Sequence, residues 1–490
     1  MGLMLVKRGG GIFVPPPPAL TEMWENPLPA CPRLTDMRLC GIGMGMTARS
    51  QEILAALLAA AKKAGADAAD ALFVENVSAS VSYRLGKLED VERSESADLG
   101  LRVFLGAKVA FVSSTDFSAD ALAGLPERAV AMAKLAPEDK YAGLAPADRL
   151  AKNIPALDLE DAEEPAPDIL VARARDAEGA AMAVKGVSNS EGGGASFTRA
   201  AVALATSNGF YGRYAGTSHG IGVAVLAGEG TNMERDYDHA SARHSSDLRS
   251  AEDIGRIAGE RTIARMNPRK VKSQSVPVVF DVRESAGIVG HFAGAISGNA
   301  IARGVSFLKD RMGDEVFAPG VSIIDDPHRL RGLRSKPFDG EGVTNQRRAF
   351  IEKGRLTSWM LDCASARQLG LETTGHAARG TGGPPHPATT NLYMEAGALS
   401  LEALIADIKQ GFYVTELMGM GVNGVTGDYS RGAAGFWVEN GKIAFPVSEV
   451  TIAGNLKDMF RHLTPANDLV FRHGTNAPTL RIEGMTIAGA

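Results

Sequence analysis

Two stretches near the C-terminal end decide the fold: GMGVNGVTGDYS at residues 419–430 and FWVENGKIAFPV at residues 436–447. Gly419, Gly421 and Gly424 satisfy G-x-G-x-x-G, the spacing of a dinucleotide-binding turn. That turn needs a strand before the glycines and a helix directly after them, because the helix N-terminus meets the pyrophosphate. FYVTELM supplies the strand, but more glycines and an Asn-Gly turn follow it. The pattern therefore predicts a β-hairpin in a glycine-rich sheet and excludes a nucleotide site.

Upstream, two segments mix helical and strand patterns, and both are predicted to be α+β domains. Residues 50–150 contain alternating strands between an Ala/Leu/Lys-rich helix and a helix that starts near Ser118. A Pro-rich acidic linker leads to residues 165–272, where Asn208-Gly209 marks a hairpin and SAED begins a capped helix. No internal repeat is apparent.

The remaining segment, residues 273–490, is predicted to be a larger β-rich domain. Its buried strand VPVVF leads into a helix that contains Gly287, Gly290 and Gly294, and SLEALIADIKQG at 400–411 predicts one further helix. The fold class is therefore α+β: an N-terminal α/β sandwich-like domain, a middle α+β domain and this β-rich C-terminal domain.

Composition narrows the class of protein. The chain has 490 residues, 45% of them hydrophobic, and a net charge of -5, which is ordinary for a soluble globular protein. It has no long basic run, so a nucleic-acid partner is not expected. No apolar run reaches the ~18 residues of a membrane helix. Three cysteines cannot form a disulfide framework, so we expect a cytoplasmic protein.

Residues 1–49, rich in proline and glycine, are expected to be a disordered extension, or to lie upstream of a start at Met44 or Met46. Cys31 and Cys40 lie there and lack nearby partner ligands for a metal.

Histidines are the main candidates for catalysis or metal binding. DYDHASARH (236–244) is interpreted as an exposed polar loop, although His239 and His244 could bind a metal there. His376 and His386 lie in a Gly/Pro loop without a clearly spaced third ligand. Cys363 lies on an apolar helical pattern and is expected in the core. No nucleophile elbow is present.

Several long motifs resemble the TldD/PmbA (TldE) family, also known as modulators of DNA gyrase. They are FDGEGVTNQRRAFIEKGRLTSWMLDCASARQLG, TTGHAARG, TNLYMEAG and GVNGVTGDYSRGAAGFWVENGKIAFPVSEVTIAGNLKDMF. LGLRVFLGAKVAFVSSTDFS is similar to the first domain of that family. The resemblance covers the chain from about Ser50 to Ala490.

The resemblance implies two branches with different site residues. TldD-type subunits carry H-E-x-x-x-H and a later cysteine as zinc ligands, and PmbA-type subunits lack them. Here Ala286 and Gly287 stand at the His and Glu positions, His291 at the second His, and no cysteine follows Cys363. The chain therefore resembles the PmbA branch, with no catalytic residue and no metal of its own expected.

What the resemblance implies for function is a shared protease. A TldD-type partner would supply zinc in a heterodimer that cleaves unfolded or extended peptides. Extended peptides bind to strand edges through backbone hydrogen bonds, so the 419–430 loop is a candidate contact. Its candidate residues are Gly419, Gly421, Asn423, Asp428 and Ser430. A turn-shaping role alone is the competing interpretation.

Two other functions remain open from the sequence. One is a stand-alone binding or regulatory protein, as a homodimer without catalytic activity. The other is an independent metallopeptidase that uses His239 and His244, or His376 and His386.

Overall fold

The structure, a computed structural model, describes residues 46–489, and its compact unit begins at Ser50. The extension expected at residues 1–49, with Met44, Cys31 and Cys40, lies outside the described residues except for the start of α1. No helix within residues 46–489 is both long and apolar enough to cross a bilayer.

The first half of the described chain has four helices of ten or more residues and six strands, and hydroxyl caps fix two of the helix starts. Ser118 accepts a hydrogen bond from the backbone N–H of Ala121, and Ser250 accepts one from Asp253, which satisfies donors that the first turn leaves unpaired. The elements are α1 (Met46–Lys63), β1 (Ala68–Arg84), β2 (Lys87–Leu105), β3 (Lys108–Ser114), α2 (Ala119–Leu135), α3 (Pro167–Met182), β4 (Val187–Thr206), β5 (Tyr211–Ala227), β6 (Glu234–Ala242) and α4 (Ala251–Ala264).

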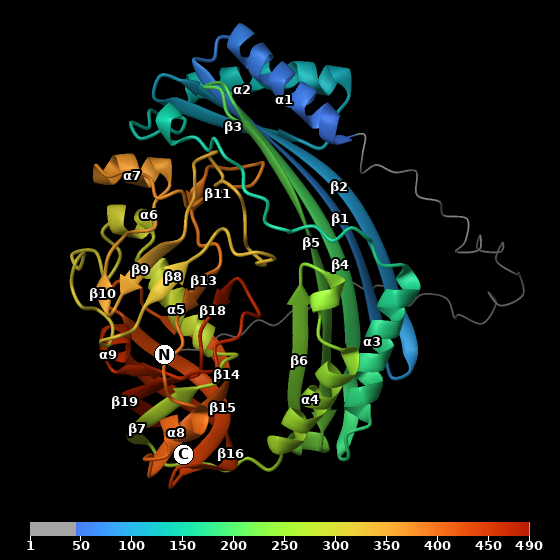
Figure 1. The fold of residues 1–490 in the computed structure, drawn as a ribbon, viewed down its shortest axis with the longest axis vertical. Coiled ribbons are helices and arrows are strands. Elements are labelled where there is room, and N and C mark those ends of the chain that lie inside the picture. Colours follow the sequence, from blue (N-terminus) through green and yellow to red (C-terminus); the bar gives the residue numbers. More distant parts are fainter. Residues whose placement is uncertain (1–45, 490) are drawn as a thin grey trace, which may run out of the picture. The chain divides into compact units, whose positions relative to one another are not determined.

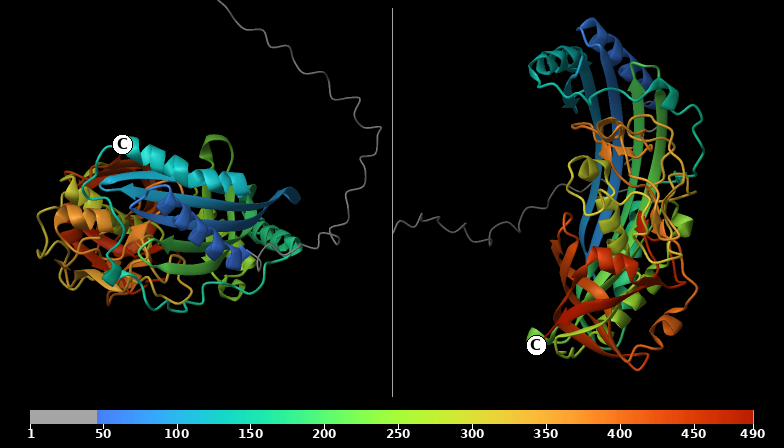
Figure 2. Two further views of the ribbon diagram at one scale, coloured as in Figure 1. Left: turned by 90° about the horizontal axis from the view of Figure 1, so that it is seen from above. Right: turned by 90° about the vertical axis from the view of Figure 1, so that its left-hand side faces the viewer.

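These six strands form one antiparallel sheet in the order β3-β2-β1-β4-β5-β6. Strand β1 pairs with β4 from Asp70↔Thr206 to Tyr83↔Gly193, so the segments 50–150 and 165–272 share a continuous sheet. Figures 1 and 2 show the long strands β1, β2, β4 and β5 running side by side. The domain boundaries at 150 and 165 stay a prediction.

The two faces of this sheet are covered by different parts of the chain, as the period of two along each strand requires. On one face, Val81 and Ala195 pack against Leu170 and Ala174 of α3. On the other face, Leu72 packs, with Leu204 and Phe210, against Phe338, Val343 and Cys363 from the C-terminal domain. Cys363 is buried, as predicted.

The order helix, three strands, helix occurs twice: once as α1 to α2 and once as α3 to α4. The two triplets meet at the β1–β4 pairing in the middle of the sheet. The sequence did not reveal this repetition, because the matching elements differ in residue pattern.

The expectation that residues 236–244 form an exposed loop is wrong. They lie largely in β6, which pairs with β5, and Asp236 and Asp238 are buried at 2% and 3% exposure. Each of these carboxylates faces arginines. Paired charges can be buried at low cost, which is why polarity alone misled the prediction.

The C-terminal domain is built around a sheet that closes on itself. Its order is β16-β15-β14-β7-β19-β17, and an additional pairing joins β16, at one end of this order, to β19. A second sheet has the order β10-β9-β8-β13-β18. The strands are β7 (Gln274–Phe280), β8 (Ile323–Asp325), β9 (Arg348–Glu352), β10 (Arg355–Leu356), β11 (Ala377–Ala378), β12 (His386–Pro387), β13 (Leu392–Met394), β14 (Gln410–Val422), β15 (Asp428–Glu439), β16 (Lys442–Asn455), β17 (Leu463–Pro465), β18 (Thr475–Asn476) and β19 (Leu480–Ala488).

The predicted hairpin is confirmed, since β15 and β16 are joined by a turn at Asn440 and Gly441. The helix predicted at 400–411 is shorter, because the chain enters β14 at Gln410 and pairs there with Glu439 of β15. Tertiary pairing overrides helix propensity at this point. The helices are α5 (Ser285–Ala295), α6 (Gly298–Ala302), α7 (Cys363–Leu369), α8 (Leu401–Ile405) and α9 (Leu456–Arg461).

Candidate functional site

Helix α5 carries the three positions at which the family motif would place zinc ligands and base. Ala286 and Gly287 lie in its first turn and carry no donor atom, and space beside Gly287 is open. His291 is half-buried, and its ring meets the edge of the Tyr429 ring at 5.9 Å. Of these three positions, the helix therefore presents a coordinating side chain only at His291. This residue set does not fit catalytic zinc, which takes three protein ligands.

His291 lines a cavity of about 380 Å³ between α5 and the hairpin formed by β14 and β15. Arg431 is the other ionisable side chain in its wall, and the remaining lining is small or apolar. The lining residues are Gly290, His291, Gly294, Ala295, Ala300, Val305, Phe307, Met420, Val422, Gly424, Arg431 and Leu456. The structure thus brings the zinc-motif helix and the glycine-rich loop to one site, although they are far apart in sequence (Figure 1).

The glycine-rich loop is a strand end and a tight turn. Gly421 pairs with Ser430, and a Cβ at Gly421 would lie 2.2 Å from the Ser430 carbonyl oxygen. Gly419 has φ of +77°, which favours glycine. Asn423 accepts hydrogen bonds from the backbone N–H groups of Val425 and Thr426.

The polar candidate residues of the loop differ in the hydrogen bonds that their side chains make. Asp428 accepts hydrogen bonds from Thr426 at 2.6 Å and from Asn455 at 3.0 Å. These contacts hold the pKa of Asp428 below its usual value. Asn423 and Asp428 therefore stabilise the turn. Both are exposed, as is Ser430, and the contact of these three side chains with a peptide stays a prediction.

One edge of β14 is open beside the cavity. Strand β14 pairs with β15 out to Val422, but with β7 only from Phe412 to Val414. Within residues 46–489, the edge beyond Val414 has no strand partner on the β7 side. Met418 and Met420 on this segment are 47% and 90% exposed. An unpaired strand edge can accept an extended peptide as a further strand.

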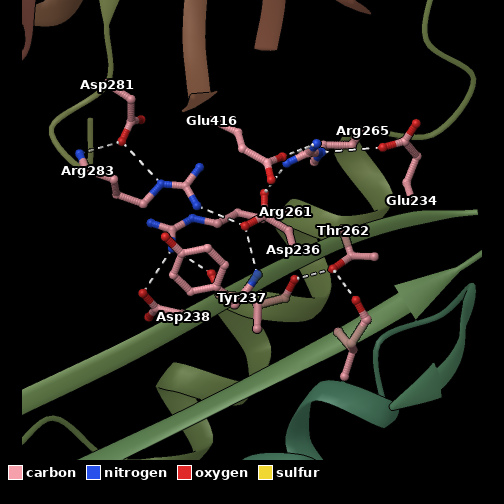
Figure 3. A network of polar contacts seen from close by, with 12 residues as sticks. Glu234, Asp236, Tyr237, Asp238, Arg261, Thr262, Arg265, Asp281, Arg283 and Glu416 are labelled. Atoms are coloured by element: carbon pink, nitrogen blue, oxygen red, sulfur yellow. Dashed lines mark hydrogen bonds and ion pairs between the residues drawn. The ribbon is translucent and has the colours of Figure 1, made fainter. Parts of the chain in front are cut away.

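A network of ion pairs fixes this site to the sheet of the first half. Arg283, just before α5, bonds Asp236 of β6 at 2.8 Å, and Arg265 after α4 pairs with Glu416 of β14 at 2.5 Å (Figure 3). Arg261 in turn bonds Asp238 at 2.9 Å. Both α5 and the open edge of β14 are thus held by charges that come from the middle segment.

Glu284, which precedes α5, is the carboxyl with the largest electrostatic perturbation at this site. Burial raises its pKa to about 7, with Asp281 and Glu416 raising it further and Arg283 and Arg431 opposing them. Glu284 lies seven residues before His291, a spacing that places both on one helix face. The sequence interpretation missed Glu284, Tyr429 and Arg431. The helical spacing could have indicated the first, and the 421–460 motif contains the other two.

Replacing Glu284 with glutamine is expected to remove a pH dependence of stability. The folded pKa of about 7 lies above the unfolded value of 4.5, so the native protein loses stability as pH rises between these values. At pH 8 the variant should melt higher than the parent, by on the order of 2 °C, and at pH 4 no gain is expected. Melting curves across this range, with the exposed Glu52→Gln as control, test this. An equal gain at both pH values would contradict it.

The other histidine pairs do not converge on metal sites. His239 stacks on Tyr237, whereas His244 bonds the backbone carbonyl of Asp158. His376 is buried against Thr374 and Asp325, and His386 is exposed on β12. Across residues 46–489, no group of three or more His, Cys, Asp or Glu side chains is arranged to hold a metal ion. That this chain acts without its own metal stays a prediction.

Comparison with known proteins gives the class of this fold and site. Residues 69–133 match the PmbA/TldA metallopeptidase domain 1, residues 158–266 the central domain and residues 273–489 the C-terminal domain. Together these matches define a metallopeptidase-type chain of three domains. The chain belongs to the PmbA/TldD family, and within it to the PmbA (TldE) branch.

Individual relatives and solved structures support the same family assignment. The chain is 40% identical to Metalloprotease PmbA of Escherichia coli O157:H7, over 86% of this chain and 92% of that protein. It is 37% identical to a PmbA homolog of Haemophilus influenzae, over 91% and 98%. The crystal structure of a proposed modulator of DNA gyrase from Bacteroides thetaiotaomicron superposes with a TM-score of 0.83 at 25% identity, covering 90% of this chain and 99% of that one. TldE from Thermococcus kodakarensis shares the fold, with a TM-score of 0.81 at 21% identity, over 89% and 100%.

Proposed function

We propose that this chain is the subunit without catalytic zinc in a TldD/TldE-type heterodimeric metalloprotease that degrades or processes unfolded or extended peptides. The observation that carries the proposal is that α5 lacks the zinc ligands and the base expected at its motif positions. Ala286 and Gly287 offer no ligand and no base, and His291 alone cannot hold zinc. The zinc, and the activated water that it supplies, would then belong to the TldD-type partner.

The contribution of this chain would be to hold the substrate. The open edge of β14 can donate and accept backbone hydrogen bonds along an extended peptide. Backbone pairing ignores side-chain identity, which suits a protease that accepts many unfolded sequences. Met418 and Met420 on the edge are flexible and polarisable, so they can adapt to different apolar side chains.

Reconstitution tests the proposal. The purified chain and a TldD-type partner are each assayed alone and then mixed, with an unfolded peptide as substrate and zinc measured in each component. We expect negligible hydrolysis by this chain alone, strong chelator-sensitive hydrolysis by the mixture, and zinc in the partner only. Full chelator-resistant hydrolysis by the chain alone would contradict the proposal.

Size-exclusion chromatography of the same samples tests the assembly. Co-elution of the two chains as a heterodimer is expected. Elution of this chain as a homodimer with or without the partner would instead favour a stand-alone binding or regulatory protein.

A further inference from the structure

A second, smaller pocket lies where β6 ends and meets loops of the C-terminal domain. It has a volume of about 180 Å³, which suits a carboxylate or a similar small group. Three of its lining residues are arginines: Arg243, Arg329 and Arg331. The others are Ser241, Ala242, Asp247, Leu330, Gly332, Leu333, Asn391, Phe471 and His473.

Arg329 is the available cation of this pocket. Its guanidinium carbon lies 3.4 Å from the centroid of the Phe471 ring. Phe471 in turn packs against Tyr393 in a T-shaped arrangement, with 5.1 Å between the ring centroids. Within residues 46–489, Arg329 makes no ion pair with a carboxylate. A guanidinium stacked on a ring keeps its N–H edge free, and that edge fits a carboxylate with two parallel hydrogen bonds.

The two other arginines contribute charge but are occupied. Arg243 donates to the backbone carbonyls of Gly332 at 3.2 Å and Thr217 at 3.0 Å, and also to that of Leu333, so its partners in the described part of the chain are all neutral. Burial lowers the pKa of Arg243, which marks the cost of keeping this cation without a countercharge. Arg331, in contrast, pairs with Asp158 and Asp247.

The surroundings reinforce the positive field. Desolvation lowers the pKa of His473 in the pocket wall, and the neighbouring His239, Arg472 and Arg334 lower it further. Arg334 and Arg472 likewise have no carboxylate within ion-pair distance among the described residues. This local excess of cations occurs in a chain whose net charge is -5, so it is not a consequence of general basicity.

We infer that this pocket binds the carboxylate of an acidic peptide, either a C-terminal carboxylate or an Asp or Glu side chain. Arg329 would form the bidentate contact, and the imidazole of His473 and the hydroxyl of Ser241 would add single hydrogen bonds. Arg243 would act through its field, since its donors are used. That the pocket binds a carboxylate is inferred from its residues alone. That this carboxylate belongs to a peptide rests on the proposed function.

The position of the pocket supports a role in peptide binding. Strand β6 leads from Asp236, which bonds Arg283 beside α5, to Ala242 in the pocket wall. At about 3.4 Å per residue this is about 20 Å. A peptide held by its carboxylate in the pocket would reach α5 with about six further residues in extended conformation.

The test uses this chain alone, without a protease partner, so its outcome is separate from that of reconstitution. Two labelled peptides of the same sequence are titrated: one has a Glu and a free C-terminus, the other a Gln and a C-terminal amide. We expect the acidic peptide to bind at least about tenfold more tightly at low salt. Arg329→Gln should abolish this difference, and Arg329→Lys should retain part of it.

Control variants and competing anions test whether the preference for the acidic peptide depends on Arg329. Arg256→Gln, on the exposed surface of α4, should leave the preference unchanged, and unchanged melting of Arg329→Gln would show that its fold is intact. Glutarate should displace the acidic peptide at concentrations where inorganic phosphate does not. Equal binding of the two peptides, a preserved preference in Arg329→Gln, or stronger displacement by phosphate would overturn the inference.

Discussion

Replacing Arg102 with methionine is expected to lower the free energy of unfolding by about 3–5 kcal/mol, the usual cost of removing one partner from a buried ion pair. Arg102 of β2 bonds Asp70 of β1 through its Nε at 2.8 Å and also through Nη2. Glu341 lies 3.7 Å from the same guanidinium, and Arg379 bonds the other oxygen of Asp70 at 2.6 Å. All four side chains are 5% exposed or less.

The size of this effect follows from what the substitution leaves behind. Burial pushes the pKa of Asp70 upward, but Arg102 and Arg379 together hold it below its usual value. Without Arg102, the buried carboxylate of Glu341 loses its nearest cation and Asp70 loses half of its partners. Because Glu341 and Arg379 belong to the C-terminal domain, the contact between that domain and the sheet would weaken as well.

Denaturant unfolding measured by circular dichroism tests the Arg102 prediction. Arg256→Met is the matched control, because this arginine pairs with Asp253 and Glu260 on an exposed helix surface. Its cost should stay within about 0.5–1 kcal/mol. If Arg102→Met costs no more than the control, the buried cluster does not stabilise the domain contact. Hydrogen exchange should also rise near Thr381, whose backbone lies against Gly100 of β2.

Gly421→Val is expected to reduce peptidase activity of the reconstituted complex by between about tenfold and 100-fold. A Cβ at this position would lie 2.2 Å from the Ser430 carbonyl oxygen, where ordinary contact begins at 3.4 Å. Strands β14 and β15 must therefore move apart by about 1 Å, and displacements of that size at a substrate-holding surface reduce rates by about 100-fold. No dinucleotide binding is expected from either protein.

The control for Gly421→Val is Gly124→Ala, at an exposed position of α2 outside the candidate site. A Cβ at Gly124 would have no neighbour within 4 Å, so the variant should keep full activity. Co-elution with the partner shows whether Gly421→Val still assembles. Full activity of an assembled Gly421→Val complex would mean that the loop is scaffold and does not hold substrate.

Local signals in the sequence predicted much of the fold. Ser118 and Ser250 cap α2 and α4, and the Asn-Gly pairs at Asn208 and Asn440 turn two hairpins. These features depend on residues within a few positions of one another, so a short window of sequence contains their whole cause. The family motifs extended the prediction to the three-domain class.

Features that depend on distant partners were not predictable in the same way. Asp236 and Asp238 suggested an exposed loop, but arginines outside this segment, Arg249 and Arg283, pair with them and allow them to be buried in β6. The helix at 400–411 was cut short by pairing of Gln410 with Glu439. In both cases the deciding contact is absent from the local pattern.

The features of the candidate site likewise divide into those that depend on local sequence and those that depend on distant contacts. The sequence by itself determined that α5 offers His291 without a second ligand, that 419–430 leads into a hairpin, and to which family the chain belongs. Only the tertiary structure decided that α5 faces the β14 edge, that burial raises the pKa of Glu284 to about 7, and that Arg329 has no carboxylate partner among residues 46–489. Residue identity sets which chemistry is available, but burial and charge pairing depend on contacts across hundreds of residues, and these exist only once the chain has folded.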